Sequence, residues 1–362
     1  MGFIPAFALL FILSCSQDDD ETWQYIGKFP APIELEGVRV FESEFGIIHI
    51  TQADSLIIIA TQRDTLFHVY DKKENYLGGF GQIGEGPYEL PFYTLIQDVI
   101  THNSAIVAFI YNQNRQTLFG VDIPASTQVT EPVVKQEYKL PQELKGAYRF
   151  HYLDKESIVG IYDDRFSRLL DHKSGGFYYY VEPDTFETFP LINLEVESNG
   201  ASPGWIMHAG MNLNIRMMAV SPDRTQIALL INRSPKLEIF RVGSHSPDRY
   251  LLHPDPPEDI FNIDLVIENA ITIYFEDLYA TDDYLYMLYS GRLLSDDESH
   301  EKYLQVIDWS GLPHKQFKFP ASYDLRSVVV DEENKVIYGM SYSNDAIYKF
   351  DYSSADKAST IN

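Results

Sequence analysis

The feature that most constrains the fold is a strand–turn–strand unit that recurs along nearly the whole chain. Each of six copies begins with an apolar strand, passes through a short acidic or polar turn, and continues with a second apolar strand. The copies are spaced by about fifty to sixty residues, close to the period of propeller blades that carry loop insertions. The first strands are predicted at residues 46–51, 96–101, 148–153, 216–221, 276–281 and 326–331. The second strands are predicted at residues 56–60, 105–111, 157–162, 226–231, 284–289 and 335–340.

These strands are apolar on both faces, so they need cover on both sides. Stacking of sheets around an axis provides that cover. No stretch shows sustained helical periodicity between capping residues, which argues against alternating strands and helices. The sequence therefore predicts an all-β fold, a six-bladed β-propeller.

The last copy predicts how the ring closes. It offers three strands, at 326–331, 335–340 and 346–351, before the composition becomes that of a polar tail at 353–362. An open edge would invite aggregation, so a fourth strand is expected from the other end of the chain. We expect residues 22–30 to supply it, with Trp23, Tyr25 and Ile26 as packing residues. The propeller is then predicted to span residues 22–352.

A glycine-rich stretch at residues 78–91 separates the first two copies. Its glycines and prolines disfavour a continued strand, which predicts a turn that crosses from one blade to the next. A phosphate-binding loop would need a helix after the glycines. Pro87 and Pro91 follow instead, so a structural turn is the favoured interpretation.

Composition and charge limit the classes of partner. Hydrophobic residues make up 45% of the 362 residues, enough for a large core. The formal net charge of −25 argues against nucleic acid or an anionic membrane surface as the main partner.

The N-terminus has the features of a lipoprotein signal peptide, predicted at residues 1–15. An apolar run at 3–13 is too short to span a bilayer, and it ends in Ile12-Leu13-Ser14-Cys15. Cys15 is the only cysteine, so no disulfide can form within the chain and lipid attachment at Cys15 is predicted. No Lys or Arg precedes the apolar run, and a buried N-terminal strand is the alternative. The acidic residues 16–21 are predicted to be a linker or a surface-export signal.

The chain resembles the TolB-like or NHL-like six-bladed propeller lipoproteins of Gram-negative bacteria. The likeness rests on residues 81–87 (GQIGEGP), residues 282–292 (DDYLYMLYSGR) and the lipobox at Cys15. It implies a monomer in the cell envelope, held at the outer membrane by its lipid anchor alone and facing the periplasm or the cell surface. Because such propellers serve unrelated functions, the resemblance implies little about activity.

Arginines predict a binding site at one mouth of the central channel. Propeller geometry places on one face the starts of innermost strands and the loops between second and third strands. Eight of the thirteen arginines are predicted there: Arg63, Arg115, Arg149, Arg165, Arg216, Arg233, Arg292 and Arg326. Guanidinium groups bind oxyanions in a bidentate manner, which favours non-catalytic binding of an anionic glycan or acidic peptide without a cofactor or metal. Aromatic residues for stacking on sugar rings would be Tyr111, Tyr162, Tyr274 and Tyr289. In the alternative interpretation, each arginine forms an ion pair with a nearby acid.

Two other functions stay open. Related propellers include metal-dependent lactonases and hydrolases, for which Asp98, Glu276 and Asp277 would be the candidate ligands. No serine-hydrolase elbow or zinc-protease motif is present, and His49 and His151 are predicted as core residues. A scaffold that recruits a protein partner would use the insertions at 195–210 and 243–259.

Overall fold

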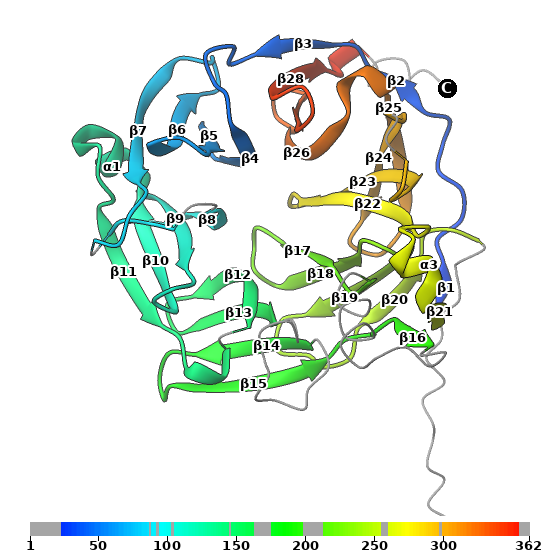
Figure 1. The fold of residues 1–362 in the computed structure, drawn as a ribbon, viewed down its shortest axis with the longest axis horizontal. Helices are drawn as coiled ribbons and strands as arrows, with labels where there is room; N and C mark the ends of the chain where they lie inside the picture. Colours follow the sequence, from blue (N-terminus) through cyan, green and yellow to red (C-terminus); the bar gives the residue numbers. More distant parts are fainter. Residues whose placement is uncertain are drawn as a thin grey trace, which may run out of the picture.

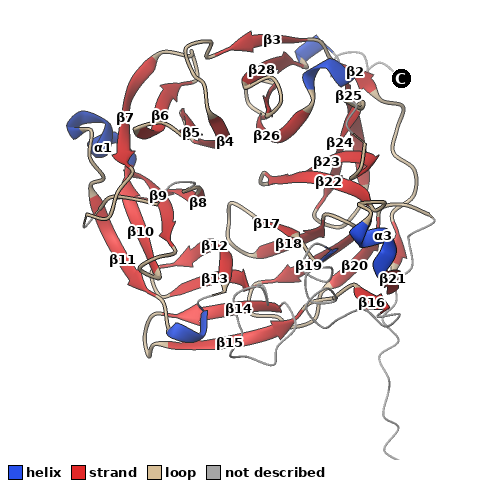
Figure 2. Ribbon diagram, in the orientation of Figure 1, coloured by secondary structure: helices blue, strands red, loops and turns tan. Residues whose placement is uncertain are grey.

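The computed structural model describes residues 23–86, 88–91, 94–102, 105–144, 146–162, 175–197, 213–254, 260–296 and 299–354. Within these ranges six sheets stand around a common axis like the blades of a propeller, which confirms the predicted fold (Figures 1 and 2). No helix in the same ranges is long and apolar enough to cross a membrane. The lipobox cysteine, the acidic linker and most of the polar tail lie outside the described residues.

The first three blades are continuous in sequence, and each is an antiparallel sheet of four strands. Blade 1 consists of β4 (Ile47–Ala53), β5 (Leu56–Thr61), β6 (Thr65–Asp71) and β7 (Tyr76–Gln82). Blade 2 consists of β8 (Ile96–His102), β9 (Ala105–Asn112), β10 (Thr117–Asp122) and β11 (Val134–Lys139). Blade 3 consists of β12 (Ala147–Asp154), β13 (Ser157–Tyr162), β14 (Gly175–Tyr180) and β15 (Thr185–Pro190).

The other three blades each include a strand from the N-terminal segment. Blade 4 consists of β17 (Arg216–Val220), β18 (Gln226–Ile231), β19 (Lys236–Arg241), β20 (Asp248–Leu251) and β1 (Gln24–Tyr25). Blade 5 consists of β22 (Thr272–Ala280), β23 (Tyr284–Leu293), β24 (Lys302–Asp308), β25 (Pro313–Phe319) and β2 (Ile33–Glu34). Blade 6 consists of β26 (Leu325–Asp331), β27 (Val336–Ser341), β28 (Ala346–Asp351) and β3 (Gly37–Val40). A separate pair, β16 (Glu195–Glu197) and β21 (Ile260–Asn262), lies beside blade 4 in Figure 1.

The hydrophobic core lies between blades. All six residues of β5 are buried, and alternate side chains serve different cores. Ile58 packs with blade 2 residues, whereas Ile57 and Ile59 pack with blade 6 residues such as Val329. A second strand therefore needs apolar residues at every position, which is the pattern that predicted stacked blades.

The glycine stretch differs from its prediction. Gly78, Gly79 and Gly81 lie within β7, so these glycines continue the outer strand of blade 1 and do not end it. Gly78 has a φ of +143°, and a Cβ there would lie 2.9 Å from the carbonyl oxygen of Thr127. Gly78 thus allows helix α1 (Ile123–Val129) to approach the strand closely. The crossing to blade 2 begins only after Gln82.

Two short α-helices were not expected from the sequence. Helix α1 begins after Asp122, whose side chain accepts a hydrogen bond from Ala125 N at 2.9 Å. Helix α3 (Ile263–Ile267) begins after Asn262, whose side chain caps Asp264 N at 2.8 Å. At seven and five residues, both are too short to show a helical period in the sequence.

The N-terminal segment closes the ring, but with different residues from those predicted. β3 pairs antiparallel with β28, in a register that places Val40 opposite Ile347 and Gly37 opposite Phe350. The earlier segment, predicted to do this, instead adds β1 in parallel to the outer edge of blade 4. Next, β2 adds in parallel to blade 5, so the chain passes the outer edges of three blades in turn (Figure 1). Tyr25, predicted as a packing residue, is 45% exposed.

Gly37 tests this closure. A Cβ at Gly37 would lie 2.5 Å from a ring carbon of Phe350, so Gly37→Val should overfill the β3–β28 pair. We expect a loss of about 1–3 kcal/mol in the free energy of unfolding, measured by urea denaturation. Val38→Thr and Tyr25→Ala, at exposed positions, should each change it by less than about 0.5 kcal/mol. A Gly37→Val protein as stable as the parent would contradict the pairing.

Candidate functional site

The central channel of the propeller forms a cavity. It has a volume of about 790 Å³ and is lined by residues from the innermost strand of every blade. These strands are β4, β8, β12, β17, β22 and β26, and each contacts its neighbours around the ring. Such a volume falls within the roughly 300–1,000 Å³ typical of small-molecule sites.

Irregular pairing brings polar side chains into this channel. In five of the six innermost strands the register with the second strand shifts by one residue near the start of the strand. β17 of blade 4 pairs without a shift and contributes Met217 and Met218. Bulges of this kind bend a strand and redirect its side chains. The channel-lining residues that directly follow the shifts are His49, Asp98, Arg149, Asp277 and Ser327.

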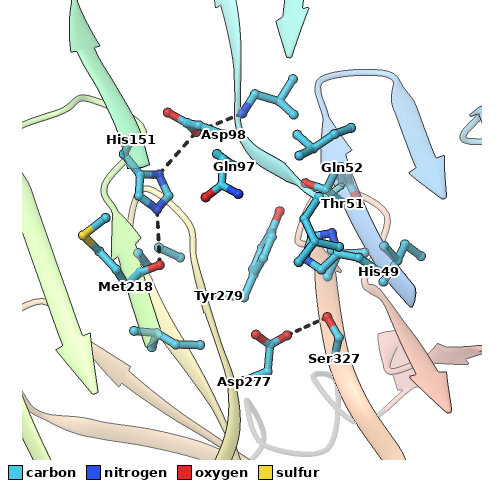
Figure 3. Close-up of a pocket in the computed structure, with 18 of the residues that line it drawn as sticks. His49, Thr51, Gln52, Gln97, Asp98, His151, Met218, Asp277, Tyr279 and Ser327 are labelled. Carbon is cyan, nitrogen blue, oxygen red and sulfur yellow. Dashed lines mark hydrogen bonds and ion pairs between the residues drawn. The ribbon is translucent and has the colours of Figure 1, made fainter. Parts of the chain in front are cut away.

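Asp98 ties three blades together. Arg224, from the turn between β17 and β18, donates from Nη1 to Asp98 Oδ2 at 2.8 Å and from Nη2 to Oδ1 at 3.3 Å. His151 Nδ1 lies 3.4 Å from Asp98 Oδ1, and His151 Nε2 lies 3.3 Å from the carbonyl oxygen of Met218 (Figure 3). Burial acts to raise the pKa of Asp98, but Arg224 and His151 outweigh it and hold that pKa below its usual value. Asp98 is therefore an ionised group that is already paired.

Glu276 lies on the channel wall between blades 5 and 6, and three basic side chains donate hydrogen bonds to it. Its Oε1 atom accepts from Arg326 Nη1 at 2.8 Å, from Lys302 Nζ at 2.9 Å and from Arg292 Nε at 3.4 Å. Burial acts to raise the pKa of Glu276, but Lys302 and Arg326 overcome it and lower the pKa. The negative charge of the Glu276 carboxylate is thus balanced by the neighbouring basic side chains.

The next residue, Asp277, is in a different situation. Its Oδ2 accepts hydrogen bonds at 2.8 Å from the Ser327 hydroxyl and from Val328 N. Burial raises the pKa of Asp277, although these bonds and the Arg149 charge act in the opposite direction. Burial and Arg149 also lower the pKa of His49 to about 4, so His49 is neutral at pH 7.

Arg149 is the cation in this region without a direct counterion. It lines the channel, and its charge acts on Asp277 and His49. No hydrogen bond and no ion pair within 4 Å joins its guanidinium to another residue of the described chain. Arg149 is therefore available to an anion that enters the channel.

The structure places the eight predicted arginines in different environments. Arg149 and Arg326 line the channel. Arg292 and Arg233 lie behind the channel wall, near Glu276. Arg63, Arg115 and Arg216 lie apart from this group.

Arg63 donates to Glu44 at 3.2 Å. Arg115 donates to backbone carbonyls of the crossing between blades 1 and 2. Arg216 is buried and also donates to backbone carbonyls. Arg165 lies outside the described residues.

Sequence reasoning did not identify several lining residues. His49 and His151, predicted as core histidines, line the channel. The four tyrosines predicted to stack on sugars pack between blades, and the aromatic residues of the lining are Tyr152, Tyr279 and Tyr342. Polar residues inside apolar first strands, such as Gln52 and Gln97, were the available signal.

The candidate metal ligands do not form a cluster. Asp98 belongs to blade 2, whereas Glu276 and Asp277 belong to blade 5. Asp98 and Glu276 are already paired with cations, which would repel a metal ion. Among the described residues, no group of three or more His, Cys, Asp or Glu side chains could hold a metal.

Comparisons with known proteins agree with the fold. No family model matches the sequence, and no curated protein matches it. A member of the DUF4221 family from Bacteroides vulgatus superposes with a TM-score of 0.59 at 9% identity, covering 88% of this chain and 96% of that one. A Bacteroides fragilis protein that its name proposes to be exported superposes with a TM-score of 0.51 at 10% identity, covering 87% and 94%. At such identities the likeness shows the propeller fold and no more.

The Asp98–Arg224 pair can be measured by a double-mutant cycle. Arg224→Gln leaves the buried Asp98 carboxylate with His151 and backbone N–H groups such as that of Tyr152, and Asp98→Asn leaves Arg224 without this counterion. Each variant should therefore cost about 1.5–3 kcal/mol of unfolding free energy. The double variant should lose less than the sum, with a coupling of about 0.5–3 kcal/mol by urea denaturation. Asp54→Asn, at an exposed position of the same lining, is the control and should be near neutral. Additive losses would show that the two side chains do not interact.

Proposed function

We propose that this propeller binds a small anionic, hydroxyl-rich molecule in its central channel without transforming it. A carboxylated or sulfated sugar fits this description. The observation that carries the proposal is Arg149, a channel-lining cation with no direct counterion in the described chain. A guanidinium in a partly enclosed space is well suited to a bidentate contact with a carboxylate or sulfate.

Electrostatics around Arg149 support an anion. The carboxylates Asp98 and Glu276 are compensated by their own cations. His49 is neutral at pH 7 because burial and Arg149 lower its pKa to about 4. The charge of Arg149 acts on Asp277, but burial raises the pKa of Asp277 and makes its ionised form less favourable.

Two glutamines in the channel favour a ligand that carries hydroxyl groups. The Oε1 atoms of Gln52 and Gln97 are buried and accept no hydrogen bond from the described residues, and both side chains line the channel (Figure 3). A buried acceptor without a donor is costly, so water would fill this role in the free protein. Sugar hydroxyls are donors that can replace such water molecules, and the ring of Tyr279 offers an apolar face nearby.

Binding is favoured over catalysis because the groups suited to acid–base chemistry are occupied. In the Asp98–His151 pair, the second ring nitrogen of His151 faces the carbonyl oxygen of Met218. A general base needs that nitrogen within reach of a substrate proton. The metal-dependent alternative needs free carboxylates, but Asp98 and Glu276 are paired with cations and Asp277 accepts hydrogen bonds from Ser327 and Val328 N.

We further propose that the protein is exported and anchored by a lipid on Cys15, at the outer membrane and with no other membrane contact. The lone cysteine behind a short apolar run supports this location. The name of the Bacteroides fragilis structural neighbour is consistent with it. A scaffold function remains the alternative, and its two proposed insertions lie partly outside the described residues.

Arg149→Gln should weaken ligand binding by roughly tenfold to a hundredfold, because a charge-assisted hydrogen bond is worth about 1.5–3 kcal/mol. Isothermal titration calorimetry with a panel of uronic-acid and sulfated oligosaccharides measures this. Arg115→Gln, at a rim arginine that bonds backbone carbonyls, is the matched control and should bind like the parent. If no member of the panel binds, or if both variants bind equally, Arg149 is not the anion contact.

Cys15→Ser should abolish lipid attachment and release the protein into the soluble fraction of a Gram-negative host. The reason is that the acyl chains need a thiol at this position. Labelled palmitate incorporation and membrane fractionation measure the change. Ser16→Ala changes the neighbouring residue and should leave both readouts unaltered. Retention of Cys15→Ser in the membrane fraction without label would show another mode of attachment.

A further inference from the structure

Blades 4, 5 and 6 meet at a group of mostly buried charges that extends from the channel wall to the space behind it, and we call this group the basic junction. It consists of the cations Arg233, Arg292, Lys302 and Arg326 and the carboxylates Glu276 and Asp324. Arg233 comes from the turn between β18 and β19 of blade 4, and Arg326 comes from β26 of blade 6. The other four residues belong to blade 5 or to its connection with blade 6.

The two carboxylates are already in use. Glu276 Oε1 accepts from Arg326, Lys302 and Arg292. Asp324 Oδ1 lies 3.7 Å from Arg326 Nε and 4.0 Å from Lys302 Nζ. Four cations therefore share two carboxylates among the described residues, and the junction carries an excess of positive charge.

Arg233 is the member of the junction whose guanidinium has hydrogen-bond donors without an acceptor among the described residues. Its side chain is buried, with only 7% of the residue exposed. Its Nε and Nη1 atoms have no hydrogen-bond partner among the described residues. Burial lowers the pKa of Arg233 to about 10; the attraction of Glu276 opposes this shift and the repulsion of Arg292 adds to it. Buried guanidinium groups without acceptors are costly, and a second cation nearby increases the cost.

The surroundings hold the charges in place. Lys302 has no exposed surface and also donates to the Ser290 hydroxyl at 3.1 Å. The Arg292 side chain is 10% exposed and donates to the Asp296 carbonyl at 3.1 Å. Since these cations cannot reorient freely toward water, a mobile anion is the simplest compensation.

From these observations we infer that the basic junction binds a compact oxyanion, coordinated by Arg233 and Arg292. The anion accepts the unmade hydrogen bonds of Arg233 and separates two like charges. It is either a free inorganic anion or the acidic group of a larger molecule. Glu276 and Arg326 also line the channel, but the proposed ligands Arg233 and Arg292 do not. The proposed anion contact therefore differs from the Arg149 contact, and the inference does not depend on the proposed function.

Thermal unfolding of the purified protein in low-salt buffer, titrated with sodium sulfate or sodium acetate at constant ionic strength, tests this inference. A specific site should give a saturable rise in Tm, of roughly 2 °C when the anion reaches ten times its Kd. Sulfate and acetate together separate a free inorganic anion from a carboxylate group. A Tm that does not change, or that rises linearly without saturation, would overturn the proposal.

Arg233→Gln removes the proposed ligand and should abolish the saturable rise for both anions. It should also unfold at a higher temperature than the parent in anion-free buffer, because an uncompensated buried charge is removed. A merely structural arginine would give the opposite second result, a lower Tm. A variant that keeps the saturable rise would contradict the assignment to Arg233.

Two further variants locate the site. Arg241→Gln changes an exposed arginine at the other end of β19 and should respond to sulfate like the parent. Arg149→Gln should also keep the saturable rise, since the channel contact is a different site. If the rise disappears in Arg149→Gln and persists in Arg233→Gln, the anion binds in the channel and the basic junction is not a site. Failure of glycan binding to the channel leaves this result unaffected.

Discussion

The pairing of β3 with β28 is the constraint on which the rest of the structure depends. An open array of six sheets would expose an edge strand and leave the core between blades 6 and 1 unfilled. That core contains Val40 from the closing strand, Ile59 from blade 1 and Tyr338 from blade 6, so it forms only when both chain ends meet. Closure also fixes the six innermost strands around one axis. The channel, and every charge pair that crosses it, follows from that geometry.

Closure alone would produce an apolar channel, since the innermost strands supply much of the inter-blade packing. The register shifts change this outcome because they allow one residue per strand to leave the apolar alternation. The polar side chains of the channel then fall into two classes, those that are paired with one another and those that are not. Asp98 is fixed by Arg224 and His151, which ties blades 2, 3 and 4 together. Arg149 has no counterion among the described residues, and the Oε1 atoms of Gln52 and Gln97 accept no hydrogen bond from them; the proposed binding site rests on these groups.

The sequence predicted the parts of the fold that depend on local pattern. First and second strands follow from apolar runs and polar turns, and both are placed within a few residues. Which N-terminal segment closes the ring depends on long-range pairing, and residues 22–30 have a more aromatic composition than Gly37–Val40. Gly78 of β7 is explained by the approach of Thr127, which no sequence pattern predicts. Arg149, Arg216 and Arg326 lie in the innermost strands predicted for them, whereas Arg292 lies within β23 and not in the loop after it. Partners such as Glu44 come from segments distant in the sequence.

The negative net charge of the chain determines where cations such as Arg149 and Arg233 can bind an anion. A chain with a formal charge of −25 repels anions at long range, so an anion must be held by local contacts in a low-dielectric setting. Exposed arginines would be screened by water and paired with the many surface acids. Arg149 and Arg233 avoid that outcome because the blades enclose them and limit the acids within reach. An acidic propeller can therefore bind anions only where its architecture separates cations from its own carboxylates, and the channel wall is such a place.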